Sequence, residues 1–380
     1  MRSTLKLFQQ LVVALPTISL LTPLAASTAE TSLTGVSSYK KNYGINTTTL
    51  THQTVFEIAD SSHSSHSHHG KHDGVDFETS TKMMGQAVFT TGFIDTAATA
   101  DNKLTSEYSF MLMTHTSFTG QDHLFASIDQ GNHNDLQMDS AMNMVMNSLT
   151  VSSLFYQFPV GDFQLTAGPL VDQDDVISAN TSIYSDAFRL SGMRFGASGA
   201  MNETGPGIAI AHTNSNGFNG SISLVADDGE NSTKGIFTRE GDDILTASIG
   251  YDSNNYGGGL IYKRSDENGD SNGVKTFGGG VYFRPEGFPT ISVMYDTSDP
   301  EGNGANSKAL MVGLDHPIGN GVASAAFESH DNAGTTTTNH EVYYNYPVND
   351  SVSVQGGFFS EEVNGADNTQ GVVVETFFTF

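Results

Sequence analysis

The sequence contains no cysteine, few basic residues and, beyond its first 30 positions, no long apolar run. The absence of cysteine excludes disulfides, cysteine-ligated zinc and thiol catalysis. Only 16 Lys and Arg stand against 42 Asp and Glu, so no basic patch is available to neutralise phosphates, and we expect no nucleic-acid partner. Without a later apolar segment of sufficient length, a chain of this kind that crosses a membrane must cross it as a closed barrel.

The rest of the composition favours strands joined by turns. The 380 residues include 40 glycines, abundant Ser, Thr and Asn, and only 15% charged residues. This composition weighs against a helical enzyme and predicts an all-β fold. No nucleophile elbow, paired zinc-binding histidines or phosphate-binding loop is present, and acidic pairs are too common to single out a glycosidase dyad. We therefore predict no enzymatic activity and no catalytic residues.

Residues 1–29 predict a signal peptide for export. Arg2 and Lys6 precede the apolar run Leu11–Leu24, and small residues follow at Ala26–Ala29, near which we expect cleavage. A membrane-anchoring helix is the alternative, but the apolar run is short and two prolines interrupt it. The sequence thus predicts an exported protein.

Residues 30–76 differ from the rest of the chain, because they are rich in Ser, Thr, Asn and His and show little periodicity. We interpret them as a short, flexible and disordered periplasmic extension. Within it lies the His tract, which consists of His63, His66, His68, His69, His72 and Asp73. Imidazoles at this density can bind zinc, copper, nickel or iron, although their spacing matches no closed zinc module. The alternative is a polar linker whose histidines bind metal only in vitro, and we expect no required cofactor.

From residue 77 onward, short turns alternate with longer polar stretches. The seven short turns are rich in residues that suit tight hairpins, and they are FTGQD at 118–122, FPVGD at 158–162, SNGFN at 215–219, SNNY at 253–256, PEGFP at 285–289, HPIGN at 316–320 and YPVND at 346–350. The eight long stretches are 94–104, 130–149, 171–206, 227–243, 264–274, 297–306, 329–339 and 362–370. Seven turns and eight loops require sixteen strands, of about 9–14 residues each, which is long enough to cross a bilayer at a tilt. The pattern predicts a transmembrane antiparallel β-barrel of about 16 strands over residues 77–380, with both termini at the short-turn side.

The C-terminal segment predicts the strand that closes this barrel. One mostly apolar row, which we expect to face lipid, consists of Phe380, Phe378, Thr376, Val374 and Val372. We expect this strand to pair with the first one. Aromatic residues beside the short turns are placed as an interfacial girdle requires, and they are Phe118, Phe158, Tyr256, Phe288 and Tyr346, together with Phe380.

Three motifs carry a resemblance to a known family. A T-S-F-T-G-x-D turn at Thr116–Asp122, a Y-x-F-P-x-G-D turn at Tyr156–Asp162 and a G-P-x-V-x-Q-D-D segment at Gly168–Asp175 follow in this order. In these motifs the chain resembles the porins of cyanobacteria, a group related to the carbohydrate-selective (OprB-like) porins and often labelled iron-uptake porins. The resemblance spans residues 77–380 and is strongest over 79–176. Larger members carry a surface-layer-homology domain and a coiled coil where this chain has its short extension, which puts anchoring to peptidoglycan in doubt.

The resemblance implies a passive outer-membrane pore for small hydrophilic solutes such as ions, metal cations and carbohydrates. It places the barrel in outer-membrane lipid with periplasmic termini. Sixteen-stranded porins are usually homotrimers, although no residue of this chain demonstrates one. The terminal Phe378 and Phe380 resemble the C-terminal signal by which the barrel-assembly machinery recognises outer-membrane barrels for insertion.

The third and longest loop is the expected place of selection. By analogy with sixteen-stranded porins, it would fold inward and narrow the lumen. The candidate constriction residues are Asp172, Asp174, Asp175, Asp186, Arg189 and Arg194. The alternative is that these charges decorate a solvated surface loop. The acidic excess predicts a preference for cations over anions. No sugar site is evident in the sequence. Stacking surfaces for a sugar would be available if four tyrosines faced the lumen, namely Tyr184, Tyr251, Tyr256 and Tyr262.

One alternative belongs to a different functional class. A secreted, soluble all-β protein would bind metal through the His tract and the acidic loops. It would have strands of about 5–6 residues and no aromatic girdle. The spacing of the last turns, about 30–33 residues, argues against this alternative because it leaves room for longer strands.

Overall fold

A computed structural model of the protein describes residues 79–96, 103–132, 136, 138, 148–185, 188, 190, 203–238, 240–266, 273–301 and 304–380. It contains sixteen strands of nine to 17 residues. In chain order they are β1 (Ser80–Thr96), β2 (Thr105–Ser117), β3 (His123–Gly131), β4 (Thr150–Val160), β5 (Phe163–Asp172), β6 (Thr204–Thr213), β7 (Phe218–Asp227), β8 (Asp242–Asp252), β9 (Tyr256–Asp266), β10 (Val274–Phe283), β11 (Thr290–Pro300), β12 (Ser307–Ile318), β13 (Gly321–Asn332), β14 (Thr335–Asn349), β15 (Val352–Val363) and β16 (Thr369–Thr379).

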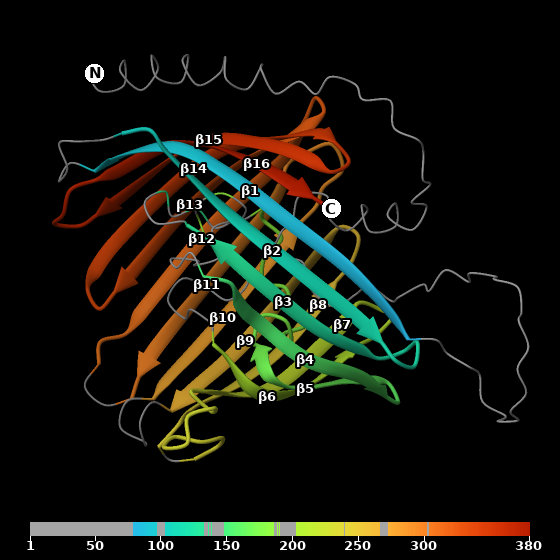
Figure 1. Ribbon diagram of the computed structural model, residues 1–380. Coiled ribbons are helices and arrows are strands. Elements are labelled where there is room, and N and C mark those ends of the chain that lie inside the picture. The colour runs from blue at the N-terminus through green and yellow to red at the C-terminus, as the bar shows by residue number, and fades with distance from the viewer. Residues whose placement is uncertain are drawn as a thin grey trace, which may run out of the picture.

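The sixteen strands form one closed antiparallel barrel, as the sequence predicted (Figure 1). Each strand pairs with its neighbours in the chain, and β1 closes the barrel by pairing with β16 over eleven residues, from Gln86 opposite Thr379 to Thr96 opposite Thr369. Closure leaves no sheet edge with unpaired backbone groups. The described ranges contain no helix, and therefore none that is long and apolar enough to span a membrane.

The seven predicted short turns all connect strands at one end of the barrel. Gly161 and Gly319 have φ of 61° and 62°, a region that glycine enters without the steric cost of a Cβ atom. This is the reason for the Pro-x-Gly pattern in two of the turns, since Pro restricts the preceding strand end and Gly makes the reversal. The local chemistry of these residues was sufficient to place the turns.

One carboxylate organises the first short turn. Asp122 accepts hydrogen bonds from the Ser117 hydroxyl at 2.8 Å and from the Tyr156 hydroxyl of β4 at 2.5 Å. It also accepts the backbone N–H groups of Phe118 and Thr119, at 2.9 and 2.8 Å. Burial alone would raise the pKa of this carboxyl, but the four hydrogen bonds outweigh burial and hold the pKa of Asp122 well below its usual range. The turn is thereby attached to the neighbouring hairpin.

The sequence predicted a long loop at 329–339, and this prediction is wrong. Strands β13 and β14 run through this stretch, and only Ala333 and Gly334 join them. Both residues have positive φ, 53° and 91°, as in the two-residue turns whose twist matches that of the strands. The Thr-rich sequence that follows has the β-branched side chains that strands favour. For this reason β14, with 15 residues, is longer than expected, and β1, with 17, also exceeds the predicted range.

Strand β16 has two distinct rows. Its outer row, predicted from the sequence, is half-exposed, whereas Val373, Glu375 and Phe377 of the other row are buried inside the barrel. Phe378 packs against Phe89 of β1, with ring centroids 5.1 Å apart. The backbone of Phe380 exchanges two hydrogen bonds with Gly85 at 2.8 and 3.0 Å. The terminal residues therefore join the two ends of the barrel wall.

Candidate functional site

Alternate residues of each strand lie on opposite sides of the barrel wall. On β11, the outward Ile291, Val293 and Tyr295 are 38%, 37% and 49% exposed. Of the inward residues of this strand, Ser292, Met294 and Asp296 are 2%, 2% and 0% exposed. Large apolar side chains exposed outside, with buried polar and charged residues among those inside, reverse the order in water-soluble proteins, and this is the order of a barrel surrounded by lipid.

The same order holds around the barrel. Exposed large apolar side chains on the outer rows include Phe89, Ile208, Ile210, Ile222, Ile249, Leu260, Phe277, Val281, Leu310, Leu314, Phe327, Val342 and Phe358. Five of the six predicted girdle residues are exposed, namely Phe118, Tyr256, Phe288, Tyr346 and Phe380, and Phe158 is half-buried. The outer surface is therefore continuously apolar between two more polar ends.

Inside the barrel, negative charge dominates. Seven strand carboxylates are buried on the inner rows, and they are Glu107, Asp129, Asp296, Asp315, Glu328, Glu341 and Glu375. Among the described residues only one Lys or Arg side chain, Lys263, is buried. It forms an ion pair with Glu203 at the start of β6. Among the described residues, the buried carboxylates of the strands thus outnumber the buried basic side chains.

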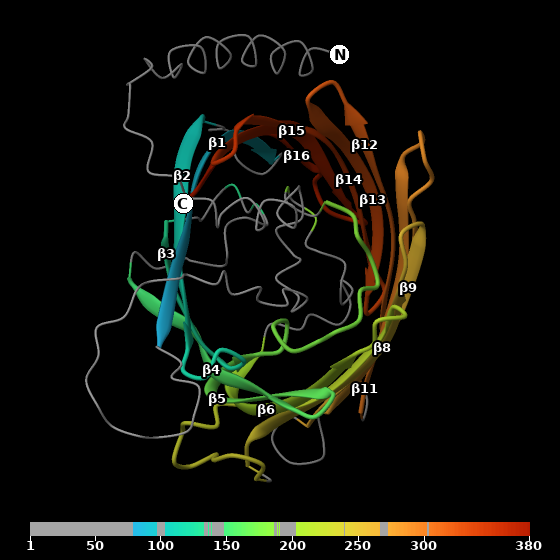
Figure 2. The same cartoon turned by 90° about the vertical axis from the view of Figure 1, so that its right-hand side faces the viewer.

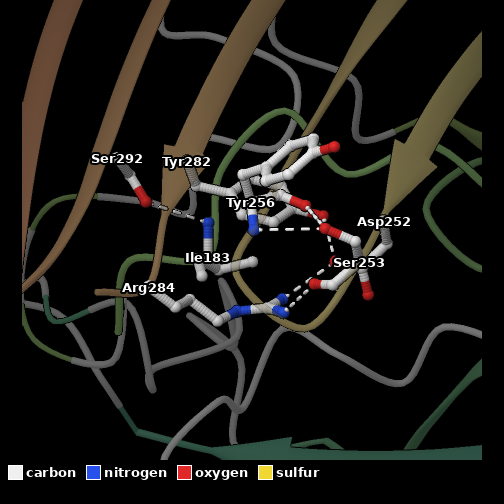
Figure 3. Close-up of polar contacts among 7 residues, drawn as sticks. All are labelled: Ile183, Asp252, Ser253, Tyr256, Tyr282, Arg284 and Ser292. Atoms are coloured by element: carbon white, nitrogen blue, oxygen red, sulfur yellow. Dashed lines mark hydrogen bonds and ion pairs between the residues drawn. The ribbon is translucent and has the colours of Figure 1, made fainter. Parts of the chain in front are cut away.

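A second cation, Arg284, lies at the short-turn end of β10. Its guanidinium donates to the Asp252 carboxylate at 3.0 Å and to the backbone carbonyl of Ser253 at 2.8 Å (Figure 3). The Tyr282 hydroxyl donates to the same Asp252 oxygen at 2.8 Å. Because Asp252 already neutralises this arginine, it adds no free positive charge to the interior.

The three acids predicted at the start of the third loop lie together. Asp172 ends β5, and its carboxylate accepts the backbone N–H of Asp174 at 2.9 Å, while its backbone carbonyl accepts the N–H of Asp175 at 3.2 Å. Asp175 in turn accepts the Ser153 hydroxyl of β4 at 3.4 Å. The other three candidates, Asp186, Arg189 and Arg194, lie outside the described residues. The structure therefore places three of the four predicted acids and leaves Asp186 and both arginines a prediction.

The third loop continues along the inner face of the wall, inside the barrel, as the green segment in Figure 2 shows. The backbone N–H of Ser178 donates to Ser221 of β7 at 3.1 Å. The backbone N–H of Ile183 donates to Ser292 of β11 at 3.1 Å (Figure 3). The segment between them crosses the inner faces of β8, β9 and β10. Its described part is therefore attached to the wall rather than spread on an outer surface.

Two carboxylates of the wall hold the far end of this segment. Asp315 of β12 accepts the backbone N–H of Ser185 at 3.1 Å, and Glu341 of β14 accepts the Tyr184 hydroxyl at 2.6 Å. Tyr343 of β14 donates its hydroxyl to the backbone carbonyl of Ser185. Burial, followed by the charge of Glu341, raises the pKa of Tyr184 far above its usual range, so its hydroxyl remains a donor. The sequence did not identify these partners, although Asp315, an acid directly after the apolar run of β12, was an available signal.

Residues of the preceding loop, between β3 and β4, also lie inside the barrel. Leu136 and Met138 are buried in an apolar cluster with Tyr184 and Phe188 of the third loop, against inward side chains of β11 to β16. The backbone N–H of Leu136 donates to the Glu107 carboxylate at 3.3 Å. Two loops therefore contribute to the interior, of which the sequence indicated one.

Polar side chains cross the seam between the last and first strands. Glu375 of β16 accepts Gln355 Nε2 at 2.6 Å and the Thr90 hydroxyl of β1 at 3.1 Å. Asn345 of β14 continues the row by donating to Gln355 at 3.2 Å. The inner wall is thus connected by hydrogen bonds from β14 to β1.

Two further predictions concern stacking surfaces and metal binding. The tyrosines would supply stacking surfaces only if they faced the lumen. Of the four, only Tyr184 lies inside the barrel, because Tyr251, Tyr256 and Tyr262 belong to outer rows of β8 and β9. The His tract lies outside the described residues. Within the described ranges, no group of three or more His, Asp or Glu side chains is arranged to hold a metal ion.

The chain is similar in fold to solved structures of known proteins. No family model and no curated protein matches the chain. An anion-selective porin from Comamonas acidovorans is similar, with a TM-score of 0.58 and 13% identity over 80% of this chain and 100% of that one. OprB from Pseudomonas putida is similar with a TM-score of 0.60 and 10% identity, over 79% of this chain and 94% of that one. A loop-deleted OmpT, an outer membrane protein of Vibrio cholerae, has a TM-score of 0.59 and 10% identity, over 80% of this chain and 99% of that one. The barrel therefore has the fold of outer-membrane porins.

Proposed function

We propose that the protein is an outer-membrane porin through which small hydrophilic solutes diffuse passively, with a preference for cations. The observation that carries the proposal is the inversion of polarity across the wall, with exposed apolar rows outside and buried charged rows inside. Such a barrel is stable in lipid, where its backbone is fully paired, and it offers a polar path through the membrane. The soluble metal-binding alternative is not favoured, because it would leave the apolar outer rows in water.

The cation preference rests on the charge of the inner wall. Among the described residues, seven strand carboxylates and one lysine are buried, and the lysine is itself paired with Glu203. An acidic path lined by low-dielectric walls concentrates cations and repels anions. The fold does not determine this sign, since a porin described as anion-selective has a similar barrel. The side chains of the inner rows would therefore decide which ions pass, and metal cations would pass more readily than phosphate.

The third loop would form the constriction. Its described residues occupy part of the barrel interior and are hydrogen-bonded to the wall at Ser221, Ser292 and Asp315. Asp172, Asp174 and Asp175 would supply the acidic side of a local field, and Asp186, Arg189 and Arg194 would supply its remaining charges. A pore of this kind selects by diameter and charge, without a chemical step.

The remaining parts of the proposal follow from the sequence. The resemblance to cyanobacterial porins supports carbohydrate or iron as natural solutes, a homotrimer as the assembly and a cleaved signal peptide for export. Phe378 and Phe380, which join the wall ends, would also serve as the signal for the barrel-assembly machinery. Both described chain ends lie at the short-turn end, which we place in the periplasm together with the His tract.

Planar-bilayer conductance of the full mature chain tests the proposal. We expect steady open steps and, under a salt gradient, a reversal potential of the sign for cation selectivity. Zinc added on the side of the His tract would block the steps if residues 63–73 bind metal near the mouth, and their deletion would remove the block. A barrel that is folded and inserted but shows no conductance would contradict the proposed pore.

A further inference from the structure

Three glycines form a row on the inner wall beneath the third loop. Gly250 of β8 lies directly opposite Gly259 of β9, which lies opposite Gly280 of β10. All three belong to inward rows, since the residues on either side of each belong to the outward rows. Three neighbouring strands therefore present bare backbone to the interior at one height, in a row that we call the glycine row.

The loop backbone fills the space that side chains would otherwise occupy. A Cβ atom on Gly250 would lie 2.7 Å from the Oδ1 atom of Asn219 on β7 and 3.1 Å from both the Cα and the Cβ of Ala179 in the loop. A Cβ atom on Gly259 would lie 2.9 Å from the backbone oxygen of Asn180. A Cβ on Gly280 would lie only 2.1 Å from the backbone oxygen of Thr181. Ordinary contacts between such atoms are roughly 3.5 Å. Consecutive loop residues thus rest on consecutive glycines, and Ala179 and Thr181 are completely buried there.

The same relation recurs two strands further on. A Cβ atom on the inward Gly313 of β12 would lie 2.5 Å from the ring of Tyr184. Tyr184 is the residue whose hydroxyl is bound by Glu341. Close approach to the wall is therefore maintained along the loop from Ala179 to Tyr184, and both hydrogen bonds and bare backbone contribute to it.

We infer that the glycine row sets the width of the pore, because it determines how far the third loop stands from the wall. This inference rests on the proposed pore function and adds the residues that determine its size limit. Any side chain at these positions must displace the loop toward the barrel axis, since the strands behind it are fixed by their neighbours on both sides. Wall residues that carry no charge would then control which solutes fit.

The test is a graded series of substitutions at the row. We expect Gly280→Ala to lower the single-channel conductance and Gly280→Val to lower it further, in that order. The triple variant G250A/G259A/G280A should exclude uncharged polyethylene glycols that still enter the unmodified pore. The sign of the reversal potential should stay the same, because no charge changes.

The matched control is Gly356→Ala on β15. Gly356 belongs to an outer row, and its Cβ would have its nearest neighbour at 3.5 Å, an ordinary contact. We expect this variant to keep the conductance and the size limit of the unmodified chain. Folded and inserted row variants with unchanged conductance and size limit would overturn the inference. An unmodified chain without any conductance would instead contradict the proposed function and, with it, the inference that depends on it.

A cross-link keeps the inference testable if the alanine variants fail to fold. The chain has no cysteine, so A179C/G250C introduces a single pair, whose Cβ atoms would start 3.1 Å apart and need about 3.5–4.5 Å in a disulfide. We expect the disulfide to form, because the loop lies against β8 at this point. We expect the conductance to be lower than that of the unmodified chain both before and after reduction, because in either state a side chain at position 250 stands beneath the loop. A folded and inserted double variant that conducts like the unmodified chain would refute the inference.

Discussion

The outer and inner faces of the barrel wall are made by the same strands and yet follow opposite rules. On the outer face, large apolar side chains such as Leu260 and Val281 are 49% and 63% exposed. On the inner face, Glu341, Asp315 and Glu375 are buried and each has named hydrogen-bond donors. The outer face therefore needs only the right chemical class of residue, whereas the inner face needs particular residues at particular positions. We expect stability in lipid to depend mainly on the first face and ion selectivity on the second.

We expect the largest loss of stability from a charge placed on the outer face. Leu260→Arg places a charge in the middle of an apolar outer row, and we expect it to lower the free energy of unfolding from lipid vesicles by about 2–4 kcal/mol. Ser353→Arg, on the half-buried inner row of β15, is the matched control and should stay within about 0.5 kcal/mol. Urea titration of both variants measures the difference. Equal losses would mean that the two faces see the same medium.

The next effect concerns the attachment of the third loop to the inner face. Tyr184→Phe removes the hydroxyl donated to the buried Glu341 carboxylate at 2.6 Å, and we expect it to cost the loop about 1.5–3 kcal/mol. Hydrogen exchange at the backbone amides of Ser178 and Ile183, which are bonded to the wall, should become faster. Tyr295→Phe on the outer face is the control and should leave these amides protected. Unchanged exchange in Tyr184→Phe would show that the contact does not hold the loop.

A smaller effect belongs to the turn where the two faces meet. Asp122→Asn should lower stability at neutral pH by about 0.5–1.5 kcal/mol, because one of the carboxylate acceptors is lost. Since the folded state lowers the pKa of Asp122 below its usual 3.8, its contribution is fully present above that pH and disappears as the pH falls toward the lower folded-state value. The difference between the two proteins should therefore shrink below about pH 4. Asp162→Asn in the next, exposed turn is the control and should change the stability at neutral pH by less than about 0.5 kcal/mol.

The smallest effect that we expect is on ion selectivity, and it concerns two adjacent residues on opposite faces of β15. Glu361 of β15 belongs to the inner row, close enough to Glu328 to interact with it, and Glu362 is exposed on the outer row. We expect Glu361→Gln to reduce the cation preference measured as a reversal potential and Glu362→Gln to leave it unchanged, with little effect of either on stability. A larger shift from Glu362→Gln would place the permeation path outside the barrel.

The sequence revealed the elements that depend on local chemistry. The seven short turns were located because Pro, Gly, Asn and Asp determine the backbone where they stand. The same reasoning failed at 329–339, because Asp331, Asn332 and Gly334 resemble a loop although only a two-residue turn separates the strands. Composition cannot distinguish a polar strand end from a polar loop when both extend beyond the apolar part of the wall.

Long-range contacts of the interior lay beyond sequence reasoning. Nothing near Tyr184 indicates that Glu341, 157 residues later, binds its hydroxyl, or that Gly280 lies beneath Thr181. These relations arise from barrel closure and strand register, which bring distant segments together. The acids at the start of the third loop were predictable because they cluster in the sequence, whereas their partners do not.

Lipid quenching of two single-tryptophan variants tests whether the outer face of the wall contacts lipid and the inner face does not. The chain has no tryptophan, and Phe358 and Phe359 are neighbours on β15, 39% and 1% exposed, on the outer and inner rows. In vesicles of brominated lipid, Phe358→Trp should be strongly quenched and Phe359→Trp should not. Equal quenching of the two, or stronger quenching of Phe359→Trp, would contradict the assignment of the apolar rows to lipid and of the charged rows to the barrel interior.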